Sequence, residues 1–419
     1  MVLIRGLPSS GHDFEVEDNA VTDLISLEKL YVDDHRMCCE LVPFIESLSL
    51  SDCKTTESWP PLNLCGSLMQ NHLLRVSMWV LGVSALVGNV VVIIWRCVGS
   101  ERGGKKTHSF FVLNLAVSDL MMGVYMLIIA AADIHFGEDY SHRANEWRSS
   151  VVCKIAGVLS VLSSEASVFF VTLISLDCFF SIVFPFSRVR IGGKSATVIV
   201  AAIWAVGVCL SVGPTIFAGI DSGVYGLSDV CIGLPLTTLP TSYVIEEYSI
   251  GNVTQFDKIG IPVGQGSQPA WIFSVVLFLG VNLLCFLIVL CCYIGIFVKV
   301  KRTVKMVRKT AHRDREIKMA VKMALIVGTD FACWMPVIIM GILSQTGAVD
   351  IGPDVYAWIV VFVLPINSSL NPYLYTIYTT VVTRRHARNL DTTTSRFTTE
   401  LKTKSVETLS ASLSELKQP

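Results

Sequence analysis

The sequence predicts an all-α membrane protein built as a bundle of seven transmembrane helices. Hydrophobic residues make up 52% of the 419 residues, and the mean hydropathy is +0.59. Charged residues account for 16%, well below the roughly 25% of a soluble domain. Seven apolar stretches are long enough to cross a hydrocarbon core of about 30 Å, and a single segment that crosses it satisfies its own backbone only as a helix.

The expected helices, in order, are 74–96, 109–132, 151–184, 196–219, 270–298, 317–344 and 356–380. Four lysines and arginines follow the first helix, three follow the third, ten lie between residues 299 and 322, and seven lie beyond residue 382. The loops on the opposite side hold three, one and none. Because basic residues collect on the cytoplasmic side, we expect the N-terminus outside and the C-terminus inside.

Residues 1–73 are expected to form a small extracellular segment before the transmembrane domain of residues 74–382. Its start, MVLIRGLPSSGHDFEVED, has no apolar core of a signal peptide, so either the first helix targets the chain or the sequence begins inside a longer gene. Four cysteines predict two disulfides in one of three pairings, and free thiols in a disordered segment are the alternative. These are Cys38, Cys39, Cys53 and Cys65, of which the adjacent two are expected to bond outward.

Residues 383–419 form a polar tail rich in Ser and Thr, which we expect to be disordered. Phosphorylation could create a docking charge there for a partner such as arrestin, and an inert tail is the alternative. The basic stretch at 299–318 suits anchoring at the lipid surface or contact with a partner protein. The chain has no Walker motif, zinc-ligand spacing or nucleophile elbow, so we expect neither an enzyme nor a nucleic-acid partner.

Polar residues inside the expected helices form the main functional signal, because such groups are costly in lipid and are functional by default. Prolines in the sixth and seventh helices can kink them and allow two arrangements of similar energy, as a switch requires. The set comprises Asn89, Asn114, Asp119, Glu165, Ser167, Asp330, Trp334, Pro336, Asn367, Ser368, Asn371, Pro372 and Tyr375.

Over roughly residues 74–390 the chain resembles the rhodopsin-like (class A) G-protein-coupled receptors. The matching features are Asn89, LAVSD ending at Asp119, Cys153 with Cys231, Trp204, CWMP at Cys333–Pro336 and NPYLY at Asn371–Tyr375. Several stretches look like the leucine-rich-repeat-containing receptors, and the relaxin-receptor branch above all, with the glycoprotein-hormone branch next. One of them, LISLEKLYVDDHRMCC, resembles a last leucine-rich element and its cysteine-rich hinge. The others are NLAVSDLMMGVYMLIIAAAD, SSEAS, IVFPF, FLGVNLLCF, Asp330 before CWMP, and LPINSSLNP.

The resemblance implies roles for several residues. Cys153 and Cys231 would form the family disulfide, with two unpaired cysteines as the alternative. A sodium pocket is implied, and a carboxylate among neutral oxygens suits such a hard cation; a protonated Asp119 bonded to Asn371 is the alternative. The pocket would comprise Asp119, Ser167, Asn367, Ser368 and Asn371. On activation Tyr293 and Tyr375 would reorganise.

The second outer loop, about 220–269, contains the glycosylation sequon at Asn252. A second match to the pattern, at Asn367, lies inside the expected seventh helix. Trp147 is expected to pack under the loops, with a hormone contact as the alternative. The seven cysteines in or near the helices are expected to be packing residues; they are Cys97, Cys178, Cys209, Cys285, Cys291, Cys292 and Cys333.

The resemblance also implies a function. The chain would be a multi-pass plasma-membrane receptor that passes a relaxin-like peptide or protein hormone signal to a heterotrimeric G protein through cyclic AMP, without a cofactor apart from the sodium ion. A truncated or decoy receptor with little coupling, and a glycoprotein-hormone-type receptor, are the alternatives. A transporter would show internal repeats and a path of charges, and the sequence has neither.

One motif departs from the family pattern. The stretch LDCFFSIVFPF, at Leu176–Phe186, ends the expected third helix, where the family has an acid, a base and an aromatic residue. Asp177 and Phe179 are present, as is the sixth-helix acid Glu316, but Cys178 stands in place of the base. A base–acid pair with Glu316 therefore cannot form. Higher basal activity and weakened G-protein coupling are both open, and we expect the second.

Overall fold

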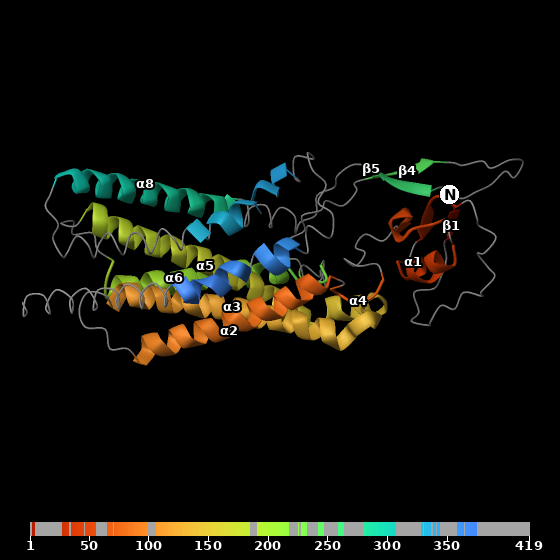
Figure 1. Cartoon of the computed structure of the whole chain (residues 1–419), viewed down its shortest axis with the longest axis horizontal. Helices are drawn as coiled ribbons and strands as arrows, with labels where there is room; N and C mark the ends of the chain where they lie inside the picture. The colour runs from red at the N-terminus through yellow and green to blue at the C-terminus, as the bar shows by residue number, and fades with distance from the viewer. Residues whose placement is uncertain are drawn as a thin grey trace, which may run out of the picture.

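The computed structural model describes most of the helical bundle and parts of the N-terminal segment (Figure 1). The described residues are 2–4, 27–32, 35–45, 47–55, 65–69, 71–98, 106–184, 191–217, 225, 228–232, 242–246, 259–263, 280–306, 328–329, 331–336, 338–340, 342–343, 358–363 and 365–374.

Five long helices run alongside one another in Figure 1, and each is long and apolar enough to cross a membrane. They are α2 (His72–Val98), α3 (Lys106–Phe136), α5 (Val151–Val183), α6 (Lys194–Phe217) and α8 (Asn282–Met306). They overlap the first five expected spans, although α8 continues past residue 298 into the basic stretch. The sixth and seventh expected spans contain helical residues 331–336, 338–340 and 365–374 and a π-helical turn, Ile359–Val363.

The helices α3 and α5 form the centre of the bundle. α3 packs against α2 and α5, and α5 also packs against α6 and α8. Within the most apolar window of each, 61% of the residues of α3 and α5 are buried, against 22–28% in α2, α6 and α8. The outer three helices therefore present most of their apolar side chains away from the protein, as lipid-facing helices do.

A short polar helix, α4 (Tyr140–Ser149), follows a 3₁₀ turn (Gly137–Asp139) between α3 and α5. Ser150 then caps α5, because its side chain accepts a hydrogen bond of 3.1 Å from the backbone N–H of Cys153. The sequence did not lead us to expect α4. Contacts with the second outer loop and with the N-terminal segment, rather than any apolar periodicity, explain why a polar decapeptide is helical here.

The N-terminal segment folds around a small core of its own. Three short strands, β1 (Val2–Ile4), β2 (Leu30–Val32) and β3 (Cys53–Thr55), pair in parallel in that order. The helix α1 (Arg36–Leu41) and 3₁₀ turns at Val42–Phe44 and Leu50–Asp52 lie between β2 and β3. Two more strands, β4 (Ser242–Glu246) and β5 (Ile259–Val263), pair antiparallel in the second outer loop. The five described strands lie outside the helical bundle, whose described segments are helical, as predicted.

The bundle has an outer end and an inner end. The outer end holds α4 and lies beside the N-terminal segment, with α1 and β1, on the right of Figure 1. The inner end is the opposite one, where α3 begins and where α5 and α8 end. One buried apolar cluster, which includes Met78 and Trp334, fills the outer half, and a second fills the inner half around Phe111 and Cys178.

Candidate functional site

A buried polar cluster joins three helices in the middle of the bundle. The carboxylate of Asp119, on α3, is fully buried and accepts three hydrogen bonds. Ser167 Oγ on α5 and Ser368 Oγ each donate at 3.0 Å, and Asn371 Nδ2 donates at 2.8 Å. Asn367, the fifth residue expected here, is 3% exposed. The structure thus brings the three hydrogen-bond donors to one carboxylate, and the seventh expected helix supplies two of them.

Two further amides on α2 and α3 form hydrogen bonds between helices, and that of Asn89 reaches Ser368 of the polar cluster. Asn89 Nδ2, on α2, donates to the carbonyl oxygens of Ala85 at 2.8 Å and Ser368 at 3.1 Å. Asn114 Oδ1, on α3, accepts a 2.9 Å hydrogen bond from Trp204 Nε1 on α6. The bonds to Ser368 and from Trp204 cross between helices, so the residues that the sequence singled out also fix how the helices pack.

The oxygen atoms around Asp119 fit a small hard cation. A carboxylate and two serine hydroxyls converge within hydrogen-bond distance, and the buried Asn371 Oδ1 has no hydrogen-bond partner among the described residues. Oxygen-only ligands of this kind suit sodium better than a transition metal. The same geometry also suits a hydrogen-bonded carboxyl without an ion.

A second buried carboxyl faces a different helix. Glu165, on α5, is fully buried, and its Oε1 accepts a 3.3 Å hydrogen bond from Asn282 Nδ2 on α8. Asn282 is also fully buried. Ser167 lies two residues further along α5 and faces α3 instead. Polar pairs therefore tie α5 to α3 and to α8 at membrane depth.

The expected switch residues are described in part. Trp334 is buried and its ring lies 6.3 Å from that of Phe286 on α8. Pro372 packs against Gly88 of α2, where a Cβ atom would come within 2.9 Å of the proline ring. Pro336 is exposed on the helical segment 331–336, and Tyr293 on α8 packs against the inner cluster. Asp330 and Tyr375 lie outside the described residues.

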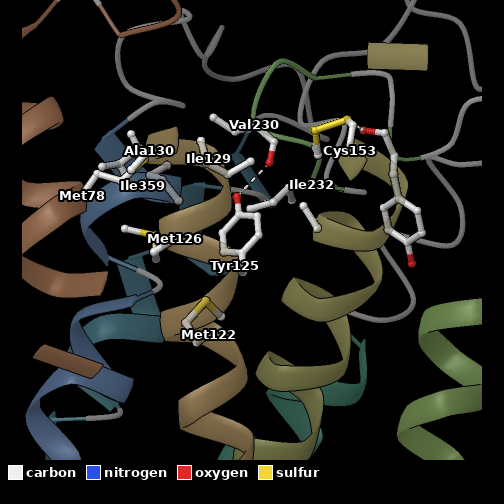
Figure 2. Packing of buried hydrophobic residues seen from close by; sticks show 14 of the residues in the cluster. Met78, Met122, Tyr125, Met126, Ile129, Ala130, Cys153, Val230, Ile232 and Ile359 are labelled. Atoms are coloured by element: carbon white, nitrogen blue, oxygen red, sulfur yellow. Dashed lines mark hydrogen bonds between the residues drawn. A yellow bond between two sulfur atoms is a disulfide. The ribbon is translucent and has the colours of Figure 1, made fainter. Parts of the chain in front are cut away.

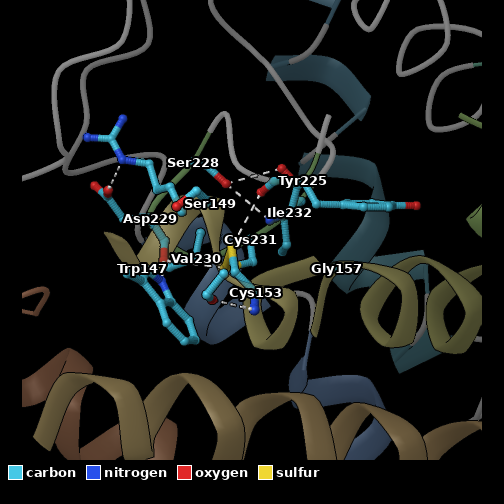
Figure 3. Close-up of a disulfide and its surroundings, with 12 residues drawn as sticks. Trp147, Ser149, Cys153, Gly157, Tyr225, Ser228, Asp229, Val230, Cys231 and Ile232 are labelled. Carbon is cyan, nitrogen blue, oxygen red and sulfur yellow. Dashed lines mark hydrogen bonds and ion pairs between the residues drawn. A yellow bond between two sulfur atoms is a disulfide. The ribbon is translucent and has the colours of Figure 1, made fainter. Parts of the chain in front are cut away.

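At the outer end, a disulfide joins Cys153 of α5 to Cys231 of the second outer loop (Figure 3). Cys231 has a φ of 54°, a left-handed backbone conformation that is uncommon for a non-glycine residue. The loop residues on either side of it, Val230 and Ile232, are buried at the outer end of the bundle. Tyr125 of α3 donates a 2.8 Å hydrogen bond to the carbonyl of Val230, as Figure 2 shows. The loop backbone is therefore held against both α3 and α5.

The helix α4 holds the same loop through Asp229. Tyr140 OH donates to the Asp229 carboxylate at 2.6 Å, and Arg148 Nε lies 3.2 Å from it. Trp147 Nε1 donates to the Asp229 carbonyl at 2.7 Å (Figure 3), so Trp147 packs under the loop. Burial, with the facing carboxylate, raises the pKa of Tyr140 well above its ordinary value, which keeps the hydroxyl protonated as a donor.

The four N-terminal cysteines form two disulfides, Cys38–Cys53 and Cys39–Cys65. Among the described residues, the segment that they close forms hydrogen bonds with α4 at Ser141. Its backbone N–H donates to the Gly66 carbonyl at 3.2 Å, its hydroxyl accepts from Gly66 N–H at 3.4 Å, and its carbonyl lies 2.8 Å from His35 Nε2. Adjacent residues of α4 thus hold the second outer loop and the N-terminal segment.

A second anchor lies where the N-terminal segment enters α2. Asp133, near the outer end of α3, is 2% exposed and forms an ion pair of 2.6 Å with Arg75 of α2. The same carboxylate accepts a 2.9 Å hydrogen bond from the backbone of Met69. Sequence reasoning missed this anchor, Ser141, and the Tyr140–Asp229 pair. Asp133 ends a stretch that resembles the relaxin receptors, but one acid at a helix end gives no sign of its partner.

At the inner end, three consecutive residues of α5 point in different directions. The Oδ2 atom of Asp177 is 4.0 Å from the Nδ1 atom of His108, which is on α3. Cys178 is 1% exposed inside the inner apolar cluster. Phe179 packs on Gly295 of α8, where an added Cβ would overlap its ring. Glu316 and the sequon residue Asn252 lie outside the described residues.

Most of the chain matches one known protein family. Residues 88–253 and 260–375 match the family described as 7 transmembrane receptor (rhodopsin family). The chain belongs to this family. It is a rhodopsin-like (class A) G-protein-coupled receptor of the leucine-rich-repeat-containing, relaxin-receptor-like branch.

Curated relatives agree with the family match. The receptor is 40% identical over 353 residues to "G-protein coupled receptor GRL101" of Lymnaea stagnalis, an alignment that covers 84% of this chain and 28% of the relative. It is 32% identical over 361 residues to relaxin receptor 1 of Mus musculus, and the alignment covers 85% of this chain and 42% of the relative. It is 27% identical over 329 residues to the thyrotropin receptor of Sus scrofa, and the alignment covers 78% of this chain and 38% of the relative.

The receptor spans less than half the length of these relatives. The relatives are receptors rather than enzymes, and so is this chain. Its family and its apolar helices identify a multi-pass protein of the plasma membrane.

Proposed function

We propose that this receptor passes the signal of an extracellular, relaxin-like peptide or protein hormone to a heterotrimeric G protein, which then stimulates cyclic AMP formation. The outer end would face the outside of the cell and the inner end the cytoplasm, as the distribution of Lys and Arg favours. The observation that carries the proposal is a continuous line of contacts from the N-terminal segment, through α4 and the second outer loop, to α5.

This line gives a hormone held outside the membrane a route to the bundle. The N-terminal segment contacts Ser141, Tyr140 next to it holds Asp229, and Asp229 lies two residues before Cys231, which is bonded to α5. A ligand shifts a two-state bundle only through its different affinity for the two states. A protein-sized ligand that moves the N-terminal segment changes the contacts along this line. Such a ligand therefore binds the two states of the bundle with different affinities.

The N-terminal segment supports a domain assignment that goes with this function. Its parallel strands pair Val2 with Leu30 and Leu30 with Cys53, which are 28 and 23 residues apart. Leucine-rich repeats place one parallel strand about every 20–29 residues. We therefore assign residues 1–73 to a last leucine-rich element and cysteine-rich hinge, 74–382 to the transmembrane domain and 383–419 to a cytoplasmic tail. Phosphorylation of this Ser/Thr-rich tail would supply docking charge for arrestin.

Sodium would act as an allosteric ligand of the same bundle. The carboxylate of Asp119 and the hydroxyls of Ser167 and Ser368 would hold it, with Asn367 and Asn371 completing the pocket. An ion bound there would tie α3, α5 and the seventh helix together in one state. We assign the rearrangement to the sixth and seventh helices, around Trp334, Pro336 and Pro372, because the two prolines can kink these helices.

The direct test uses cells that express residues 1–419 with a surface tag. Cyclic AMP is measured without ligand, with relaxin-like peptides and with glycoprotein hormones, at matched surface levels. We expect a relaxin-like peptide to raise cyclic AMP, and a response to a glycoprotein hormone instead would support that rival assignment. Tyr140→Phe serves as an internal comparison, because it breaks the contact line and should weaken the response at equal surface level.

A receptor with little coupling is the second candidate, and Cys178 favours it. The usual base of the family is missing there, and the position is enclosed by apolar side chains. Cys178→Arg should then raise cyclic AMP per surface receptor, while the size-matched Cys178→Ser should not. Equal signalling by all three proteins would mean that this substitution does not limit coupling.

A further inference from the structure

A buried acid on α5 and a buried amide on α8 are joined by one hydrogen bond. Asn282 Nδ2 donates to Glu165 Oε1 at 3.3 Å, and both residues are fully buried. The other two oxygen atoms of the pair, Glu165 Oε2 and Asn282 Oδ1, are also buried and have no hydrogen-bond partner among the described residues. With an ionised acid both atoms are acceptors only. An ionised acid would therefore leave two buried acceptors unsatisfied, which is costly.

The hydroxyl groups that lie closest to Glu165 along α5 donate elsewhere. Ser164 Oγ donates to the carbonyl of Ser160 at 2.6 Å. Ser167 Oγ donates to the carboxylate of Asp119 at 3.0 Å. Because a hydroxyl has a single hydrogen to donate, neither serine also donates to Glu165.

The sequence provides no basic partner for Glu165 on the seven helices. Glu165 lies near the middle of the third expected span, 151–184. Basic residues occur in three of the seven expected spans, and only near the ends of these spans. They are Arg75, Arg96, Lys154, Lys318 and Lys322. An acid at membrane depth without a basic partner is expected to be neutral, because an isolated charge is expensive there.

We propose that Glu165 carries a proton, which it shares in a hydrogen bond with Asn282 Oδ1. The neutral acid donates through Oε2 while Oε1 still accepts from Asn282 Nδ2, so the two side chains form a closed pair with two hydrogen bonds. One proton satisfies both oxygen atoms and removes a charge from apolar surroundings. Those surroundings include Val281 and Leu283, which flank Asn282 on α8 and pack against the outer apolar cluster.

The two buried acids of the bundle therefore differ in kind. Asp119 accepts three hydrogen bonds, which stabilise a charged carboxylate, whereas Glu165 accepts one. The proton on Glu165 ties α5 to α8 in the way that the donors around Asp119 tie α3 to α5 and to the seventh helix. Without the proton, a carboxylate oxygen and the Asn282 carbonyl oxygen would repel each other and loosen α8 from α5.

Infrared spectroscopy of the purified full-length receptor, in a detergent without ester groups, tests the proposal. The carbonyl stretch of a protonated acid lies apart from that of a carboxylate. At neutral pH, Glu165→Gln should lose a protonated-acid band that the wild type has, and Asn282→Leu should keep this band but shift it. Glu146→Gln, which replaces an exposed acid on α4, is the matched control and should leave the protonated-acid region unchanged. Loss of a carboxylate band in Glu165→Gln instead, as an ionised acid with a bound cation would give, overturns the proposal.

Thermal unfolding of matched variants gives a second measurement. Glu165→Gln keeps a neutral pair that can form two hydrogen bonds, so its melting temperature should stay close to that of the wild type. Glu165→Leu leaves the Asn282 amide unsatisfied and should melt at lower temperature, whereas Glu165→Leu/Asn282→Leu removes both polar groups and should recover most of this loss. Equal losses in Glu165→Gln and Glu165→Leu would contradict a neutral acid. Neither measurement uses a hormone or a G protein, so both outcomes are independent of the proposed function.

Discussion

At the scale of single residues, Asp119 joins three helices, with three donors around one buried carboxylate. If sodium binds there, thermal unfolding of the purified receptor should occur at higher temperature in sodium chloride than in choline chloride of equal ionic strength. The gain would be about 2.7 kcal/mol with sodium at a hundred times its dissociation constant. Asp119→Asn should abolish this difference, and a wild-type receptor indifferent to sodium would rule out the site.

Gly157 has no side chain, and this lets the second outer loop pack closely against α5. A Cβ atom there would overlap the ring of Tyr225 and lie 2.6 Å from the Cys231 carbonyl oxygen. Gly157→Ala should therefore displace the loop and cost about 1–3 kcal/mol in the free energy of unfolding. Gly213→Ala, on α6, is the control, because the added Cβ would meet no described atom within 4 Å beyond its own helix backbone and chain neighbours. Equal melting temperatures for the two variants would show that the loop adapts freely.

At the scale of elements, α4 is held by contacts rather than by its own sequence. Tyr140→Phe removes a hydrogen bond to a charged acceptor, which should cost about 1.5–3 kcal/mol. Asp229→Asn should remove part of the same energy, so the double variant should fall short of the sum. Thermal unfolding of the four proteins gives this coupling energy. Glu146→Gln, which breaks an exposed pair with Arg143 on the same helix, should change little.

The transmembrane helices could be predicted from the sequence, whereas α4 and the strands β1–β3 could not. Length and hydropathy predicted the transmembrane spans because a membrane imposes a minimum apolar length on each helix. Polar residues at membrane depth were equally visible, since water-free surroundings make each one costly, and Asp119 and Glu165 do meet partners there. No such constraint acts on α4 or on β1–β3. Their stability comes from distant partners, such as Asp229 for Tyr140, which no local pattern reveals.

At the scale of the whole molecule, the described residues of the N-terminal segment hydrogen-bond to the bundle at Ser141 of α4 and at Asp133 of α3, which accepts from the backbone N–H of Met69. The disulfide Cys39–Cys65 holds Gly66 next to Ser141, and it closes a separation of 26 residues. Replacing both cysteines by serine removes a constraint of about 3–4 kcal/mol in the chain-entropy account. The Gly66 contact should weaken as a result.

Hydrogen–deuterium exchange tests this expectation on the purified receptor. Amides of α4 and of the loop around Cys231 should exchange faster in Cys39→Ser/Cys65→Ser, while those at the inner end of α5 should not change, because local openings remain local when the central helices stay packed. The control is Cys38→Ser/Cys53→Ser, which loosens the core of the N-terminal segment at a bond that does not adjoin Gly66. It should affect α4 less. If both double variants accelerate exchange in α4 equally, the contact at Ser141 depends on the folding of the whole segment, and the N-terminal segment acts on the bundle as a single rigid unit rather than through Gly66.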